Sequence, residues 1–195
     1  MMTDTDKIFG FYDASLNNGA IKLIAERLPN NSTIVELGTM FGRSAIAWAD
    51  IMRALNKACK IYTLDRFDLS PQYVLTEFTY LYGRESVWPF IINECSHLDM
   101  VRKIIEPYPE IEPVVCDFQT VPDNIKNVDC IYYDGWHYGP NLSTCIANWI
   151  SALNENGIFS GQYYHLEGVE NTLNSLNLKI VVPKEDSTVY YLAHK

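Results

Sequence analysis

The sequence is short of basic residues and has no long apolar run. Fifteen Lys and Arg stand against 24 Asp and Glu, for a formal net charge of −9, so we expect no nucleic-acid partner. No run approaches the roughly 18 apolar residues of a membrane span. The polar, acidic start over residues 1–6 is also unlike a signal or transit peptide. These absences predict a cytoplasmic protein that has no membrane partner.

The five cysteines are scattered, and none stands in a C-x-x-C pair. A zinc site or a disulfide framework is therefore not expected. The sequence also lacks internal repeats, low-complexity tracts and a linker between domains. With 195 residues, of which 48% are apolar, the chain is predicted to form one domain with a sizeable core over residues 1–195. Residues 1–30 are expected to form an N-terminal arm.

What the sequence does have is a strand–loop–helix pattern near its start. A β-branched apolar run ends in Glu36, and two glycines follow before a helical stripe begins. Gly38 can take a positive φ and has no Cβ to keep a ligand from the backbone. Gly42 stands where the first N–H groups of the helix face the loop. The pattern predicts a nucleotide-type crevice, although an ordinary strand-to-helix turn would carry the same two glycines.

The spacing of the glycines bears on the ligand. A dinucleotide fingerprint has a third glycine between these two, which lets a pyrophosphate approach the backbone. Met40 stands at that position. The loop therefore favours a ligand with no pyrophosphate.

Apolar periods predict an α/β chain with a mostly parallel sheet. Strands are expected over residues 33–37, 60–65, 113–118, 128–135 and 158–161. Helices between them require right-handed crossovers and parallel pairing, and residues 154–157 are expected to end the helix before the fifth strand. Two last apolar runs, on either side of Pro183–Ser187, predict an antiparallel hairpin at the sheet edge.

Residues 67–112 interrupt this order. The segment is dense in aromatic residues and too long for one crossover helix, and we predict two helices in it, joined over residues 83–89. An insertion beside the crevice could form a substrate lid or a dimer surface. The sequence does not choose between them. A homodimer through this insertion or through the edge hairpin is one expectation.

Acids end four of the predicted strands, at Glu36, Asp65, Asp117 and Asp134. Parallel strands bring their carboxyl ends to one edge, where open α/β sheets bind ligands. In nucleotide-binding folds an acid at the position of Asp65 accepts hydrogen bonds from ribose hydroxyls. Asp117 could accept from a base amine while Phe118 covers the base plane. Four such acids beside a glycine loop are hard to explain as solvated strand ends.

The chain resembles class I S-adenosylmethionine-dependent methyltransferases in four stretches: E-L-G-T-M-F-G-R-S at 36–44, Asp65, D-C-I-Y-Y-D-G-W-H-Y at 129–138, and Trp149 with G-I-F-S-G-Q-Y-Y at 157–164. Within that class it is most similar to the small-molecule branch with D-G-x-H-x-Y after the fourth strand. The resemblance covers about residues 30–165. It implies a Rossmann-like, doubly wound sheet of seven strands, mostly parallel, with an antiparallel last strand.

The resemblance also implies an activity and a cofactor site. The protein would transfer a methyl group from S-adenosylmethionine, leaving S-adenosylhomocysteine, to a small-molecule acceptor, with oxygen favoured as the accepting atom. The first glycine loop would hold the methionine part of the cofactor, Asp65 the ribose, and Asp117 with Phe118 the adenine. The cofactor-binding residues expected are Glu36, Gly38, Thr39, Gly42, Ser44, Asp65, Arg66, Asp117, Phe118 and Asp134.

Catalysis needs a base near the acceptor, and histidine suits that role at neutral pH. His137 is the first candidate, together with Asp134 and Tyr163, although His137 could instead cap the helix that starts near Pro140. Tyr164 and His165 are second candidates, whereas His97 and His194 are expected at the surface.

The resemblance departs from the family at one position. In many relatives the fifth strand ends G-x-D-Y, and that aspartate joins the acid after the fourth strand in binding a divalent metal. Here Tyr163 replaces it, and a neutral phenol is a poor ligand for a hard cation, which puts a metal in doubt. Two other functions stay open: an S-adenosylmethionine-binding protein without transferase activity, and a nicotinamide-dependent dehydrogenase, which Met40 disfavours.

Overall fold

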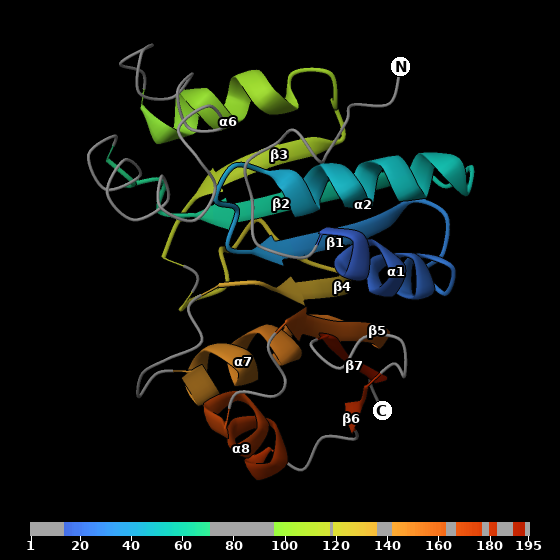
Figure 1. Cartoon of the computed structure of the whole chain (residues 1–195). Coiled ribbons are helices and arrows are strands. Elements are labelled where there is room, and N and C mark those ends of the chain that lie inside the picture. The colour runs from blue at the N-terminus through green and yellow to red at the C-terminus, as the bar shows by residue number, and fades with distance from the viewer. Residues whose placement is uncertain are drawn as a thin grey trace.

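The protein is described by a computed structural model over residues 14–70, 96–117, 119–135, 142–162, 167–176, 180–182 and 189–193. A seven-stranded sheet runs through this described part, in the order β3-β2-β1-β4-β5-β7-β6 (Figure 1). The strands are β1 (Ser32–Leu37), β2 (Cys59–Asp65), β3 (Ile111–Val115), β4 (Val128–Tyr133), β5 (Leu153–Gln162), β6 (Ile180–Val181) and β7 (Val189–Ala193).

The first five strands pair in parallel, and β7 runs antiparallel to both β5 and β6. The parallel α/β architecture that the sequence predicts is confirmed. The strand order reverses between β1 and β4, which are neighbours in the sheet. In open α/β sheets a ligand crevice lies beyond the carboxyl ends of the strands at such a reversal.

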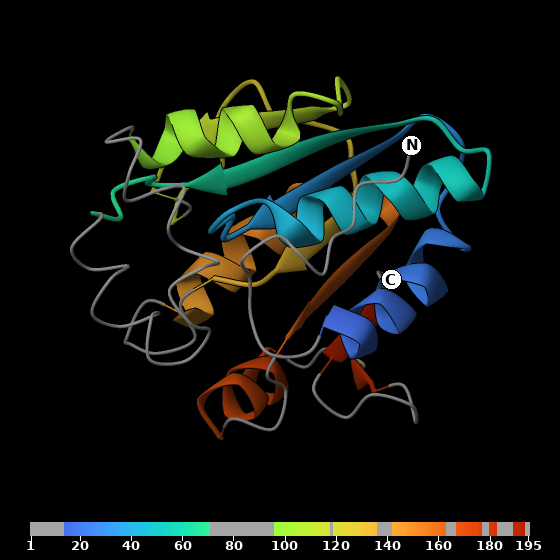
Figure 2. The same ribbon diagram turned by 45° about the horizontal axis from the view of Figure 1, so that its top comes forward.

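Helices cover both faces of the sheet (Figures 1 and 2). They are α1 (Ala14–Ala25), α2 (Arg43–Ala54), α6 (His97–Ile105), α7 (Leu142–Ser151) and α8 (Glu167–Ser175). One buried cluster joins α1, α2 and α6 to one face, and a second joins α7 and α8 to the other. Side chains alternate between faces along a strand, so Ile34 lies in the first cluster and Val35 in the second.

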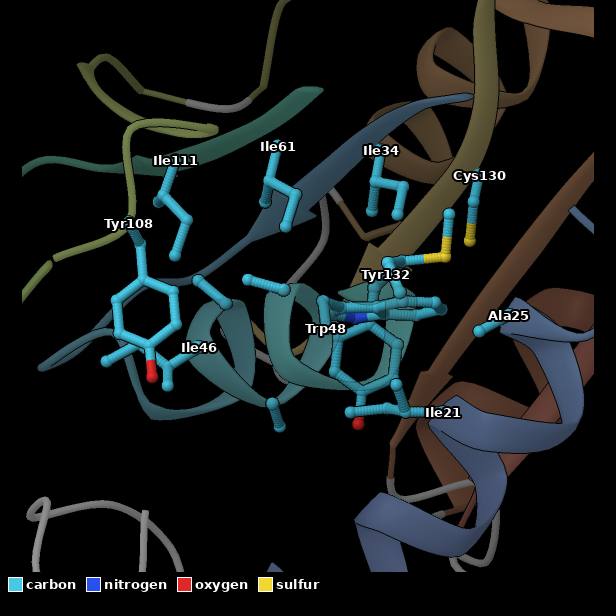
Figure 3. Packing of buried hydrophobic residues seen from close by; sticks show 14 of the residues in the cluster. Ile21, Ala25, Ile34, Ile46, Trp48, Ile61, Tyr108, Ile111, Cys130 and Tyr132 are labelled. Carbon is cyan, nitrogen blue, oxygen red and sulfur yellow. The ribbon is translucent and has the colours of Figure 1, made fainter. Parts of the chain in front are cut away.

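Trp48 of α2 is the largest fully buried side chain of the first cluster. Figure 3 shows Ile34 and Ile61 pointing from the sheet toward it. Its ring meets that of Tyr132 on β4 edge to face, with the ring centroids 5.8 Å apart. This packing fixes α2 over β1 and β4, and with it the place where the helix begins.

Two element boundaries differ from the sequence prediction. The third strand covers Ile111–Val115 rather than 113–118; it accommodates Pro113 because β3 is an edge strand, with β2 as its neighbour on one side. Residues 154–157 lie within β5 and not in a helix stop. The β4–β5 pairing breaks its register there, between Val128 and Cys130, so polar residues and a glycine are tolerated.

The second of the two helices predicted in the insertion, after residues 83–89, is present as α6. The other predicted helix of the insertion and its connection over 83–89 fall in residues 71–95, outside the described residues, as do residues 1–13 of the N-terminal arm. Among the helices of the described ranges, none is long and apolar enough to cross a bilayer.

Candidate functional site

The glycine loop, residues 38–42, joins the end of β1 to the start of α2. Three of its residues have left-handed backbone: φ is +99° at Gly38, +50° at Met40 and +82° at Gly42. Gly42 is the N-cap residue of α2, and no side chain caps the helix there. The positive end of the α2 dipole therefore lies at the loop, where it would stabilise an anionic group.

Gly38 is required by the protein backbone itself. A Cβ at this position would lie 2.5 Å from the carbonyl oxygen of Asp134 and 2.8 Å from the Cα of Gly135. Only glycine allows the ends of β1 and β4 to approach this closely. The sequence predicts a glycine here for access to a ligand, and the close approach of β4 is a second reason for it.

Glu36 is buried at the carboxyl edge of the sheet, with 0% of its surface exposed. Its Oε2 accepts a hydrogen bond from the hydroxyl of Thr63. Its Oε1 is buried with no hydrogen-bond partner among the described residues. Burial raises the pKa of Glu36 to about 7. Side-chain hydrogen bonds from Ser44 and Thr63 favour the ionised carboxylate and partly offset this rise.

Asp134 lies close enough to Glu36 for the two charges to interact. Burial, and then the charge of Glu36, raise the pKa of Asp134 well above its usual range. Gln162, at the end of β5, donates through its Nε2 to Asp134 Oδ2 over 3.3 Å and to the Tyr132 hydroxyl over 2.9 Å. The edge thus holds the buried carboxyl group of Glu36 and the half-buried one of Asp134, and a cation would stabilise both.

Asp65 accepts hydrogen bonds from backbone N–H groups of the protein, whereas its contact with ribose hydroxyls stays a prediction. Its Oδ2 accepts from the backbone N–H groups of Thr39, over 2.9 Å, and Met40, over 3.1 Å. Its Oδ1 accepts from the N–H of Phe67 over 3.2 Å. Asp65 therefore holds the glycine loop in place. Oδ1 retains capacity for a further donor, because a carboxylate oxygen has two lone pairs.

His97 was expected at the surface, and that prediction is wrong. It is 2% exposed, and its Nε2 is hydrogen-bonded to the carbonyl oxygen of Met40. The first turn of α6 brings it against the glycine loop. The sequence held a signal for this: His97 is four residues before Val101, a buried residue of the same helix face.

The other expected site residues are either exposed, half-buried or outside the described ranges. Arg66 and Asp117 are exposed; Arg66 pairs with Asp68 over 3.2 Å, and Asp117 accepts from the N–H of Gln119. Ser44 is half-buried in the first turn of α2. Phe118, His137, Tyr163, Tyr164, His165 and His194 lie outside the described residues. In the described ranges, no three His, Cys, Asp or Glu side chains gather as a metal site would require.

Two side chains of the site were missed by the sequence analysis, Thr63 and Gln162. Alternation along the strands places both on the face that α2 covers, since Thr63 is two residues before Asp65 and Gln162 is two after Ser160. An uncharged polar residue at a buried strand end is the signal that could have indicated them.

A family model described as a methyltransferase domain matches residues 35–161, more than half of the chain. The protein belongs to this family. The matched region begins in β1 and ends in β5, so it contains the glycine loop, Asp65 and Asp134. A search of curated proteins found no match to the sequence.

Solved structures share the fold. The O-methyltransferase NovP superposes with a TM-score of 0.64 at 14% identity, over 92% of this chain and 80% of that one. The S-adenosylhomocysteine-bound methyltransferase PaMTH1 of Podospora anserina gives 0.60 at 15% identity, over 97% and 81%. The CMeT domain of the citrinin polyketide synthase superposes with a TM-score of 0.60 at 15% identity, over 93% of this chain. The match spans 53% of that longer chain, about half of its length.

Gly38→Ala is expected to destabilise the protein more than Gly42→Ala. The new methyl group at 38 would meet backbone atoms that cannot move aside, and its φ is unfavourable, for a loss of roughly 3 kcal/mol or more. At position 42 the closest atom is the side-chain Cγ2 of Ile105 at 3.2 Å, so a loss of about 1–2 kcal/mol is expected. Denaturant unfolding of both variants measures the difference. Equal losses of unfolding free energy in the two variants would show that the close approach of β4 is not what requires glycine at position 38.

Glu36→Gln is expected to stabilise the ligand-free protein, and more so as the pH rises. The carboxyl group of Glu36 has an ordinary pKa of 4.5 and a folded pKa of about 7, so between these values the folded chain holds a proton that the unfolded chain has released. The protonated Glu36 therefore makes its full contribution to the free energy of unfolding below about pH 4.5. This contribution is lost as the pH rises toward 7, and the loss is at most about 3 kcal/mol.

Thermal unfolding at about pH 5 and about pH 8 checks this dependence. Glu112→Gln, which changes an exposed glutamate of β3, is the matched control and should show no such trend. A stability gain for Glu36→Gln that is equal at both pH values would contradict the assignment.

Proposed function

We propose that the protein is an S-adenosylmethionine-dependent methyltransferase that acts on a small molecule, with oxygen as the accepting atom. The observation that carries the proposal is the buried Oε1 of Glu36, which lacks a hydrogen-bond partner among the described residues and lies at the sheet edge beside the start of α2. A buried acceptor of this kind is a costly feature unless a ligand donates to it.

The residues at this edge fit the charges of S-adenosylmethionine. The cofactor has a positive ammonium and a positive sulfonium group, and both would be stabilised by Glu36 and Asp134. It also has one carboxylate, which suits the uncapped N-terminus of α2. A nicotinamide dinucleotide would instead bring two negative phosphates close to the same two acids. The charge pattern therefore favours the sulfonium cofactor over the dehydrogenase alternative.

The bound cofactor would supply an electrophilic methyl group on its sulfonium sulfur. The chain's own contribution is to orient the acceptor oxygen in line with that group and to take its proton. We assign proton removal to His137, three residues beyond Asp134, and expect Asp134 and Tyr163 to line the acceptor side. As it takes the methyl group, the acceptor oxygen would give its proton to the His137 imidazole, and the sulfonium would leave as an uncharged thioether.

Calorimetric titration with S-adenosylmethionine, S-adenosylhomocysteine and NAD tests the proposal. We expect micromolar affinity for the two sulfur compounds, none measurable for NAD, and at least about tenfold weaker S-adenosylmethionine binding by Glu36→Gln, because a charge-assisted contact is lost. Glu112→Gln is the control for a distant change of charge. No binding of either sulfur compound would remove the proposal.

Glu36 is a sharper test position than Asp65. Asp65→Ala would remove the ribose contact and also release the N–H groups of Thr39 and Met40 that Asp65 holds. Weaker binding by that variant would not separate the two causes.

His137→Ala should keep cofactor affinity and lower turnover by roughly 10²-fold or more, because it removes the base and leaves the cofactor contacts. Release of S-adenosylhomocysteine with small hydroxyl-bearing acceptors is the measurement. Turnover equal to wild type would assign His137 to capping the next helix. Tight cofactor binding with no turnover on any acceptor would favour the alternative of a cofactor-binding protein.

A further inference from the structure

The strained residue of the glycine loop is Met40. It is not a glycine, yet its φ is +50°, a left-handed conformation that is unfavourable for a residue with a Cβ. Its side chain is half-buried, so the loop has no deep apolar anchor at this point. The conformation must be maintained by contacts that Met40 makes through its backbone.

Two elements hold the backbone of Met40, one on each side. Its N–H donates to Asp65 at the end of β2. Its carbonyl oxygen is bonded by His97 at the start of α6. A carbonyl oxygen only accepts, so the Nε2 of His97 carries the hydrogen. The loop is thus held by a carboxylate on one side and by a histidine donor on the other.

His97 is itself fixed in position. Its ring lies between the rings of Phe41 and Phe67, each with its centroid 5.3 Å away in an edge arrangement. Ser96 caps the helix by accepting from the N–H of Asp99 over 3.2 Å. Phe67 also has a left-handed φ, of +52°, and donates to Asp65. His97 and Asp65 therefore both contact Met40 and Phe67, Asp65 through their backbone N–H groups and His97 through the Met40 carbonyl and the Phe67 ring.

We propose that His97 is a positioning residue, which fixes the cofactor-binding conformation of the glycine loop through its hydrogen bond to the Met40 carbonyl. The ligand part of this inference rests on the proposed function, whereas the loop part does not. A loop that is already ordered loses less conformational freedom when a ligand binds. His97 is thus expected to act on cofactor affinity and to leave the chemical step unchanged.

Three variants separate the hydrogen bond from the packing. His97→Phe keeps an aromatic ring between Phe41 and Phe67 and removes the donor. His97→Gln gives up the ring and retains an N–H group at about the position of Nε2. Tyr108→Phe is the control: it removes a buried hydroxyl that donates to Asp50 over 3.3 Å on the same face of the sheet, away from the loop.

The first measurement is amide hydrogen exchange of residues 38–42 in the ligand-free protein. We expect roughly tenfold faster exchange in His97→Phe, the equivalent of about one hydrogen bond, and rates close to wild type in His97→Gln and Tyr108→Phe. The second is calorimetric affinity for S-adenosylhomocysteine, expected to fall roughly tenfold in His97→Phe and to be largely restored in His97→Gln.

Unchanged exchange in His97→Phe would overturn the proposal, whatever the protein binds. Equal changes of exchange rate in His97→Phe and His97→Gln would also overturn it, because the packing of the ring and not the N–H donor would then hold the loop. Faster exchange with no S-adenosylhomocysteine binding by the wild type would support the loop role and remove the proposed function alone. If His97→Phe does not fold, His97→Met is measured instead; failure of both to fold would assign His97 to the core and overturn the inference.

Discussion

Two carboxyl groups, of the buried Glu36 and the half-buried Asp134, lie near one another at the ends of adjacent strands, and the site depends on this constraint. Loss of hydration raises the pKa of both groups, and the charge of Glu36 raises the pKa of Asp134 further, so the ligand-free protein disfavours two negative charges at this edge. A cation that enters between them reverses this preference. The ligand-free protein is therefore less stable than it would be with neutral side chains at these two positions. Natural proteins commonly give up stability in this way at binding sites.

Around this pair the protein arranges groups that are already in place. Asp65 holds two N–H groups of the glycine loop, and the hydroxyl of Thr39 lies 2.6 Å from that of Thr63, which donates to Glu36. The loop and the buried acid thus belong to one hydrogen-bonded network. The side chains of such a network are costly to change singly, since each removal leaves a buried partner unsatisfied.

The sequence predicted the elements better than the contacts between them. The apolar runs that end in Glu36 and Asp134 are buried strands, and their acids meet at one edge as parallel pairing requires. That Asp65 would accept from the loop backbone could not be predicted, because it depends on Met40 taking a left-handed conformation that no local pattern indicates. His97 was misplaced because its polarity was given more weight than its helical phase with Val101.

The contact between Gly38 and the backbone of Asp134 limits how proteins with this architecture can diverge. With so little space between the ends of β1 and β4, an inserted residue at 134 or 135 would displace the glycine loop. The backbone of Gly38 therefore constrains the length of the chain at these two positions. New acceptor preferences would therefore have to arise from segments that enter the site from farther along the chain, where insertions leave the loop undisturbed.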